Sequence, residues 1–445
     1  MKPYYRISLL PALWLFAAPI QSAPPSADDF LPPVRASTPE QQQQLEQVKG
    51  PVQEVKDPAT GQTAAQGQTA QDAINFVVNK HSAGAEMIKA GSGIGWVATG
   101  VGGYDVMENP TATRIAKRNA YVKAFLDAKK KLAEALNGLS SEGRTQVVEQ
   151  MEQVTDNKAD LANFAATQNE KLEQAVQMLL KGFVIYAVED DAAKKTVYVS
   201  IVTTPKTRGQ FNRPSPNGME ADSIRDGLSQ VLLEIQNGLI PPVGGKIIQV
   251  PATGEIAFVG FGSDVIRTSD NSAMQAKMRL NADKIAQMRA KDALVGMIIG
   301  DDTGWQSKLD ESTQQTIKQF ETSDSGSDAS LQRFEKTRQT FQNTQKSSEQ
   351  FQSVRSGILP PGVTPKTFTS KDDAEVYAVV VYIPSVSQQA DQTAREMNQA
   401  QLLVNPNEAG GAAAPTTTAP DVNAPRPSGT VAPGPSGTVS RDKDL

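Results

Sequence analysis

Two long stretches of the chain repeat one pattern of small, apolar and polar positions. Residues 118–138 read RNAYVKAFLDAKKKLAEALNG, and residues 280–300 read LNADKIAQMRAKDALVGMIIG. When Asn119 is aligned with Asn281, an offset of 162 carries the match to the final glycine of both stretches without a gap. Residues four apart share one face of an α-helix, so we predict two equivalent helices whose small residues allow close packing on a sheet or another helix. The matching alanines are Ala120, Ala124 and Ala128 in the first copy and Ala282, Ala286 and Ala290 in the second.

Further elements repeat on either side of these helices. An amphipathic run and a β-prone run ending in Gly-x-Gly come before each helix, and a hairpin with an acidic, lysine-containing turn comes after it. In the second copy a proline weakens the first strand of the hairpin. The chain is therefore a tandem duplication. The paired segments are 72–80 with 226–236, where Ile74, Val77 and Val78 fall opposite Leu228, Val231 and Leu232, then 95–102 with 256–262, 182–188 with 363–369, and 196–202 with 375–383.

An insertion separates the long helix from the hairpin in each copy. Residues 141–180 and 306–352 have helical patterns with narrow apolar stripes, which predict projecting helical hairpins. Without the insertion, each copy reads as a helix, a strand, a long helix and a strand hairpin. The predicted fold class is α+β: two tandem modules, 71–205 and 219–385, each a small antiparallel sheet of three strands covered on one face by helices, with a linker at 206–218.

The N-terminus has the pattern of a secretory signal. Lys2 and Arg6 precede an apolar run over residues 7–20, which small residues follow. This run is too short for a stable membrane span, so residues 1–22 are expected to form a signal peptide that is cleaved after Ser22. An uncleaved signal that anchors the chain is the alternative. No transmembrane segment is expected once the signal is removed.

Both ends of the remaining chain are poor in apolar residues. Residues 23–70 are rich in Pro, Gln, Thr and Ala, and residues 405–445 form a Pro/Gly/Ser/Thr tail in which PSGTV occurs twice. Such segments bury too little apolar surface to offset the entropy of ordering, so we expect a disordered leader and a disordered tail, with a short helix at 386–404. The tail is interpreted as a spacer, with a docking ligand for a partner as the alternative.

Composition and charge exclude several classes of protein. The 445-residue chain has a formal charge of -5, and its Lys and Arg residues are interspersed with acids, which argues against a nucleic-acid partner. Loss of Lys2 and Arg6 with the signal takes this charge to -7. Cysteine is absent, so the chain has no disulfides and no thiol that could carry a lipid. We therefore expect a non-lipidated protein in a bacterial periplasm.

Few residues suggest chemistry. His81 is the one histidine, so it cannot belong to a histidine cluster, and we expect it to be a cation at the C-terminal end of a helix. The glycine-rich runs 100–105 and 260–265 lack the third glycine of a dinucleotide-binding loop, which favours a packing role for their glycines. No catalytic, cofactor-binding or metal-ligating residue is assigned, no cofactor is expected, and the binding residues are unknown at this point.

Carboxylates gather in three places along the chain. They could bind Ca²⁺ or act as acid and base, but lysines lie beside them and the spaced oxygen ligands of a calcium loop are missing, which favours solvated turns. Two distant carboxylates could still build a glycosidase site. The groups are Glu189, Asp190 and Asp191, then Asp301 and Asp302, then Asp372 and Asp373, and the lysines are Lys194, Lys195 and Lys371.

The repeated pattern resembles a family of bacterial envelope proteins. The Gly-x-Gly strand, the Asn-Ala helix and the closing strand are similar to the small outer-membrane lipoprotein domain, which also forms the front of the flagellar T-ring assembly protein. The resemblance implies a strand-helix-strand-strand module and a structural or assembly role, although this chain lacks the lipidated cysteine. The matching residues are Gly100, Gly102, Asn119, Ala120, Ala124, Ala128 and 197–199, then Gly260, Gly262, Asn281, Ala282, Ala286, Ala290 and 376–379.

Three hypotheses of function follow. The first is a non-enzymatic periplasmic structural or assembly protein that docks other envelope proteins, as a monomer or a homo-oligomer. The alternative is a periplasmic carbohydrate- or peptide-active hydrolase that uses paired carboxylates, and its signature would be a concave pocket holding two acids with raised pKa values. A small-ligand-binding protein would need an aromatic-lined cleft, which the aromatic content of 6% disfavours.

Overall fold

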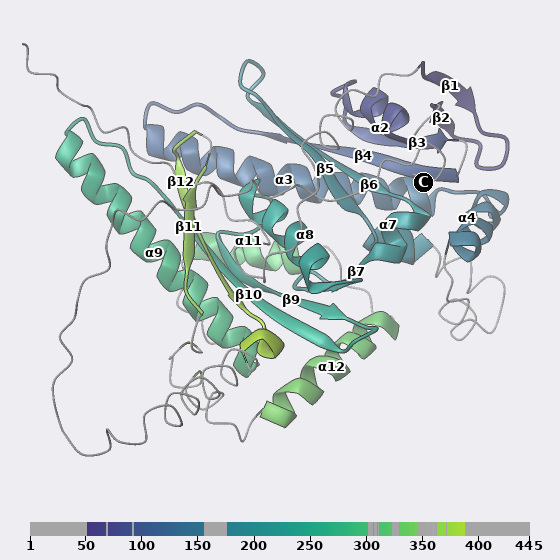
Figure 1. Cartoon of the computed structure of the whole chain (residues 1–445). Helices are drawn as coiled ribbons and strands as arrows, with labels where there is room; N and C mark the ends of the chain where they lie inside the picture. Colours follow the sequence, from purple (N-terminus) through teal and green to yellow (C-terminus); the bar gives the residue numbers. More distant parts are fainter. Residues whose placement is uncertain are drawn as a thin grey trace, which may run out of the picture.

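The computed structural model (Figure 1) describes residues 51–67, 70–90, 93–154, 176–300, 311–322, 329–345, 363–370 and 372–387, together with Gln306, Leu309, Val354 and Leu359. The expected signal peptide, the leader as far as residue 50 and the tail lie outside the described residues. So do residues 155–175 of the first insertion and all but the first two residues of the helix expected at 386–404.

Sheet A is formed by the first copy. Its six strands lie in the order β1-β2-β3-β4-β6-β5. Neighbouring strands are antiparallel except β2 and β3, which are parallel because helix α2 (Ala70–Val78) crosses from one to the other. The strands are β1 (Gln53–Lys56), β2 (Thr63–Gln66), β3 (Gly84–Ala90), β4 (Gly93–Gly103), β5 (Val184–Asp191) and β6 (Thr196–Thr203).

Sheet B, formed by the second copy, repeats this topology. The order is β11-β12-β10-β9-β8-β7, and again one neighbouring pair, β8 and β9, is parallel. Each strand of sheet B therefore has a counterpart in sheet A, and the duplication extends over the whole module. The strands are β7 (Phe211–Ser215), β8 (Gly218–Ala221), β9 (Val243–Val250), β10 (Glu255–Val265), β11 (Lys366–Thr369) and β12 (Glu375–Tyr382).

Helices cover both faces of each sheet. Val97 of β4 packs in the cluster formed with α2, whereas Trp96 and Ala98 point to the opposite face, against α3. In the second copy α8 and α9 take the same two positions. The expected sheet with one open face is therefore wrong, because strand side chains on both faces are apolar. The helices are α2 (Ala70–Val78), α3 (Pro110–Asn137), α4 (Ser141–Val154), α7 (Pro205–Gln210), α8 (Ile224–Gln236), α9 (Ser272–Ile299), α11 (Glu311–Thr322) and α12 (Ala329–Gln345).

The alanine stripes serve close helix-sheet packing, as predicted. A Cβ atom added at Gly100 would lie 2.1 Å from the carbonyl oxygen of Ala124, and one at Gly262 would lie 2.5 Å from that of Ala286. Gly100 therefore corresponds to Gly262, at the helix offset of 162. The alignment of the two Gly-x-Gly runs from sequence, which sets Gly100 opposite Gly260, is therefore wrong by two residues. At the offset of 162, Gly260 matches Ala98.

The predicted α+β class with two tandem modules is confirmed, but each module is larger than the sequence suggested. Strands β1 and β2 lie within the expected leader 23–70, and α7, β7 and the start of β8 occupy the expected linker 206–218. These strands have four or five residues each, and two of them carry mostly exposed polar side chains or a proline. Such strands lack the apolar alternation by which strands are recognised.

The two modules share one continuous hydrophobic core. The α3 face of sheet A and the α8 face of sheet B contribute to the same cluster of buried residues. The ring of Phe125 on α3 stacks on that of Phe320 on α11, with 6.2 Å between the ring centroids. We call this contact region between the modules the seam. The residues that join the modules, α7 included, pack within the body of the protein and do not form a free linker.

The described parts of the insertions pack against the modules and do not project from them. In the first insertion, Val147 of α4 is fully buried. In the second, Phe334 of α12 is buried, and Phe341 lies 5.1 Å from Phe258 of β10 between ring centroids. Among the described residues, no helix is both long enough and apolar enough to span a membrane.

Candidate functional site

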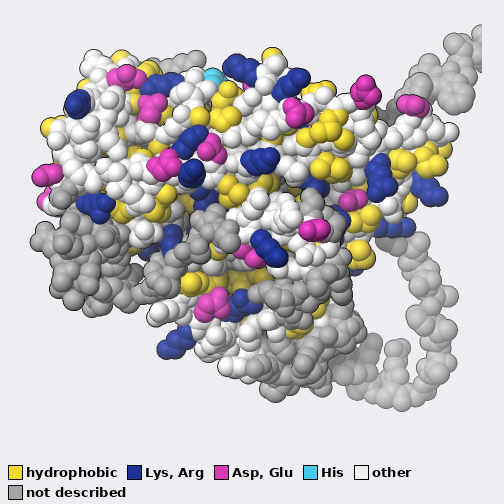
Figure 2. All heavy atoms as spheres, turned by 180° about the vertical axis from the view of Figure 1, so that it is seen from behind, with side chains coloured by type: hydrophobic (Ala, Val, Ile, Leu, Met, Phe, Trp, Pro, Cys, Tyr) yellow, Lys and Arg dark blue, Asp and Glu magenta, His cyan; other side chains and the backbone are white. Residues whose placement is uncertain are grey.

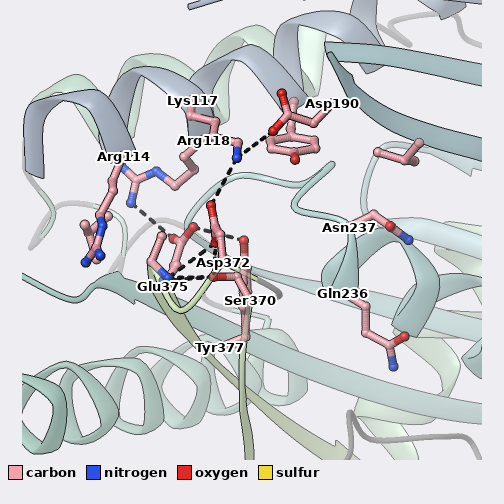
Figure 3. A pocket seen from close by; sticks show the side chains of 14 residues that line it. Arg114, Lys117, Arg118, Asp190, Gln236, Asn237, Ser370, Asp372, Glu375 and Tyr377 are labelled. Atoms are coloured by element: carbon pink, nitrogen blue, oxygen red, sulfur yellow. Dashed lines mark hydrogen bonds and ion pairs between the residues drawn. The ribbon is translucent and has the colours of Figure 1, made fainter. Parts of the chain in front are cut away.

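A pocket of about 320 Å³ opens in the seam. Figure 3 shows that α3 supplies one wall through Arg114, Lys117 and Arg118, whereas Gln236 and Asn237 at the end of α8 supply the opposite wall. Residues of β5, β10, β12 and the turn before β12 complete the lining. The pocket therefore exists only because the two modules meet, which is a common place for a binding site.

Lys117 ties the end of β5 in the first module and the turn before β12 in the second to α3. Its Nζ lies 2.6 Å from Oδ2 of Asp190 in the first module and 3.1 Å from Oδ2 of Asp372 in the second. Burial alone would lower the pKa of Lys117, but the hydrogen bonds to Asp190 and Asp372 outweigh burial and raise it. Lys117 is therefore a fixed positive charge that lies between two carboxylates.

Arg118 makes a second connection across the seam. Its guanidinium lies 3.4 Å from Oε1 of Glu375, which also accepts a hydrogen bond of 2.7 Å from the hydroxyl of Ser263. The other oxygen of Glu375 accepts a hydrogen bond of 2.9 Å from the hydroxyl of Tyr377. The Nε atom of Arg118 is buried and has no hydrogen-bond partner among the described residues. The carboxylate is thus held from three sides.

Two further groups of the pocket have shifted pKa values. Burial alone would raise the pKa of Asp372, but hydrogen bonds from Ser370 and Lys117, together with the charge of Lys117, lower it overall. Burial raises the pKa of Tyr121 to about 12, although the charge of Lys117 opposes the shift. At neutral pH the pocket therefore contains an ionised Asp372 and a neutral Tyr121 phenol.

This arrangement suits a clamp or a polar binding site better than acid-base chemistry. A cation stands between Asp190 and Asp372, whereas a glycosidase pair needs room for a sugar or a water between its carboxyl groups. Gln236 and Asn237 lie on the other side of the cavity from the charged wall (Figure 3), and the amide of Asn237 donates to the carbonyl oxygen of Leu233 at 2.8 Å. No cluster of His, Asp and Glu side chains in the described part of the chain could hold a metal ion.

A buried charge cluster lies elsewhere in the seam. Glu234 of α8 is bonded to Arg213 of β7 at 3.0 Å and to Lys246 of β9 at 3.1 Å, and all three side chains are buried. The guanidinium of Arg213 also donates to the carbonyl oxygen of Phe183 in the first module and lies 4.1 Å from the centre of its ring. Burial would raise the pKa of Glu234, but the two cations lower it. The cluster thus links the second module to the first.

The residues singled out from the sequence have mostly structural environments. His81 follows α2 and its Nδ1 lies 2.8 Å from Oε2 of Glu189, so it has a carboxylate partner besides the helix end. Asp191 pairs with Lys194 at 2.9 Å within the hairpin turn, in agreement with the solvated turn that was expected. Asp373 pairs with Arg279 at 2.8 Å. Asp301, Asp302 and Lys371 lie outside the described residues.

Sequence reasoning missed that Asp190 and Asp372, 182 positions apart, meet at one lysine. It also missed Arg114 and Arg118. A signal for these two was present, because the equivalent positions of the second copy are Ala276 and Leu280. Charged residues stand on α3 at two positions where α9 has apolar residues, although the rest of the pattern repeats. This difference indicates that the two helix faces have different surroundings.

The surface seen from behind (Figure 2) shows Lys and Arg side chains interspersed with Asp and Glu, without a broad area of one sign.

Comparison of the chain with models of protein families, with curated proteins and with solved structures finds no match. The resemblance to the envelope module therefore stays a prediction.

Proposed function

We propose that this chain is a non-enzymatic structural or assembly protein that docks other components of a bacterial envelope from the periplasm. The observation that carries the proposal is the seam. There, two equivalent modules form one body, and the pocket between them is crossed by ion pairs of Lys117 and Arg118. Such a site holds modules in a fixed relation, which is what a scaffold requires.

The outward face of α12 is the docking element that the described surface favours. This helix buries Phe334 and turns Gln332, Lys336 and Gln339 to solvent. These three positions follow a spacing of four and three, so they share one helical face. A polar helix face that is carried by a rigid sheet is suited to a reversible protein contact.

The hydrolase alternative receives less support. It calls for two acids with raised pKa values in one pocket, whereas the pKa of Asp372 is lowered by Lys117 and Ser370. The lysine between Asp190 and Asp372 would also have to leave before either could transfer a proton to a substrate.

Site-specific photocrosslinking in intact cells tests the proposal. A photoreactive amino acid is placed at Gln332, Lys336 or Gln339 in the full chain, and at Thr253 in the β9–β10 turn as an exposed control. We expect adducts with the same envelope protein from the α12 positions and not from Thr253. Absence of adducts from α12, together with hydrolysis of periplasmic glycans or peptides by the purified chain, would reverse the choice between the two functions.

Export and oligomeric state have separate tests. Mass spectrometry of the protein from a periplasmic extract should give an N-terminus at Ala23, because the signal is expected to be cleaved after Ser22. A chain that stays in the cytoplasm at full length contradicts the periplasmic part of the proposal. Sedimentation velocity distinguishes a monomer from a homo-oligomer.

A further inference from the structure

The outer face of α9 is uncovered, whereas the equivalent face of α3 lies in the seam. At the offset of 162, Arg118 and Val122 of α3 correspond to Leu280 and Lys284 of α9. Arg118 pairs with Glu375 of the second module, and Val122 is buried. Leu280 and Lys284 are both exposed. This face therefore makes a contact between the modules on α3, whereas the equivalent face of α9 is exposed.

The exposed apolar side chains of the described residues gather on this side of the molecule. The six large ones have exposed fractions from 39% to 59%, and all lie on α9 or around the N-terminal end of α3. The starts of the two helices adjoin, since the amide of Thr268 donates to the hydroxyl of Thr111 at 3.5 Å. Figure 1 shows both N-terminal ends on the same side of the protein. The six residues are Val106, Met107, Ile115, Met274, Leu280 and Met288.

On this side of the molecule the α9 stretch carries more exposed bases than acids, whereas the exposed Asp105 and Glu108 lie beside Val106 and Met107 before α3. Between positions 267 and 292 the exposed ionisable residues are four bases and two acids, although the chain as a whole carries -5. The remaining ionisable residues there are half-buried, and Arg279 and Arg289 are paired with Asp373 and Asp264. An anionic partner would complement this face. The four bases are Arg267, Lys277, Lys284 and Lys291, and the two acids are Asp270 and Asp292.

Heptad spacing distinguishes a lipid surface from a partner helix. Met274, Asn281 and Met288 repeat every seven residues, and Lys277, Lys284 and Lys291 repeat three positions later. A helical partner on this stripe of α9 would bury three lysines at positions that coiled coils fill with apolar side chains. At a membrane surface the lysine ammonium groups instead reach lipid phosphates while methionine and leucine side chains enter the boundary of the acyl chains.

We propose that the outer face of α9 docks the protein on an anionic phospholipid membrane surface. Met274, Leu280 and Met288 supply the apolar contact, and the three lysines supply the attraction to phosphate. This inference goes beyond the proposed scaffold function and rests on the surface of α9, not on α12 or the seam.

Vesicle sedimentation tests it directly. The chain from Ala23 to Leu445 is used, because it keeps every described residue and omits an apolar N-terminal run that could itself bind lipid. We expect binding to vesicles of phosphatidylethanolamine and phosphatidylglycerol that falls with added salt, and little binding to phosphatidylcholine. Replacing the three lysines of the α9 face by Gln should weaken binding by roughly 100-fold, on the basis of the contribution of each lysine near an anionic surface.

Two matched variants separate apolar from electrostatic contributions. Replacing Met274, Leu280 and Met288 by Ser should weaken binding at least about 10-fold, because the apolar area that enters the membrane is lost. Replacing the exposed Lys56, Lys123 and Lys130 by Gln removes the same charge elsewhere and should leave binding close to that of the parent chain. Equal urea midpoints show that all variants are folded.

Other results overturn the inference. It fails if the parent chain does not sediment with anionic vesicles, or if the two α9 variants bind as tightly as the parent. It also fails if a photocrosslinker at Leu280 captures an acidic protein and no lipid in cells. None of these results bears on the crosslinking test at α12, so the two proposals can fail separately.

Discussion

Gly100 of β4 lies so close to Ala124 of α3 that a single added Cβ atom would stand 2.1 Å from the alanine carbonyl oxygen. The neighbouring backbone of Ala128 is as close to that point. A side chain at Gly100 would therefore push α3 away from sheet A along its whole alanine stripe. The equivalent contact of Gly262 with Ala286 places the same constraint on the second module.

Replacing Gly100 by Ala should destabilise the protein by about 3 kcal/mol, because the helix backbone must move to admit the methyl group. Gly103 at the end of the same strand is a matched control, since a Cβ atom there meets nothing within 4 Å. Gly103→Ala should change the free energy of unfolding by no more than about 0.5 kcal/mol. Urea unfolding followed by circular dichroism measures both, and equal midpoints for the two variants would contradict the packing argument.

Replacing Lys117 by Met should loosen the seam by removing the ion pairs with Asp190 and Asp372. The site is partly open to solvent, and screening limits the expected loss to about 1–2 kcal/mol. The loss should depend on pH. Folding lowers the pKa of Asp372 below its ordinary value of 3.8, so its contribution is present above that pH and disappears as the pH falls through the lower, folded value.

Acid unfolding of Lys117→Met therefore tests whether the contribution of Asp372 to stability is lost as the pH falls. Its difference in stability from the parent chain should shrink as the pH is lowered below 3.8. Lys130, which is exposed and makes a weak contact with Glu134 at 3.9 Å, provides the control substitution. A pH-independent difference would show that the lysine acts through packing alone.

Replacing Glu234 by Gln should cost about 3–5 kcal/mol, because it leaves Arg213 and Lys246 buried without a counter-charge. The triple variant Arg213→Met, Glu234→Leu, Lys246→Met removes all three charges and should recover much of this loss. Denaturation midpoints at neutral pH compare the two. A triple variant less stable than the single one would show that the buried charges themselves favour the fold.

Tyr121 should make the fold sensitive to alkali. Burial raises its pKa from 10.0 to about 12, so the folded state holds the neutral phenol and the associated stability is full below pH 10 and is lost as the pH rises towards 12. A Tyr121→Phe variant cannot ionise and should lose less stability over this interval. Urea unfolding at pH 8 and pH 11 measures the difference, and parallel losses in both proteins would refute the assignment.

The duplication and the long helices could be predicted from the sequence because the alanine stripe is both periodic and repeated. The apolar faces of α2 and α8 followed from the same logic, and Ile74, Val77 and Val78 are buried like their counterparts. Strands β1 and β2 could not be predicted, because Gln53–Lys56 and Thr63–Gln66 are four residues long with mostly polar outer positions. β2 is stabilised by pairing with β3, and β1 by pairing with β2, which local composition does not encode.

The seam pocket lay beyond sequence reasoning for a different reason. Periodicity indicates which face of a helix is apolar, but it does not identify the module that covers a charged face. Asp372 lies in the predicted turn and Asp190 lies in β5 next to the other predicted turn, yet their meeting at Lys117 depends on how the modules pack. The departure of Arg118 from Leu280 in the repeat was the available clue.

The short connection between the modules bears on the history of the gene. Seven positions, 204–210, separate the end of β6 from the start of β7, and α7 within them begins with a reciprocal pair of hydrogen bonds between Thr204 and Thr207. Splitting the reading frame there would give two polypeptides, each with the apolar half of a shared interior facing water. Once the two copies shared one hydrophobic core, neither module could fold alone without exposing apolar side chains to water.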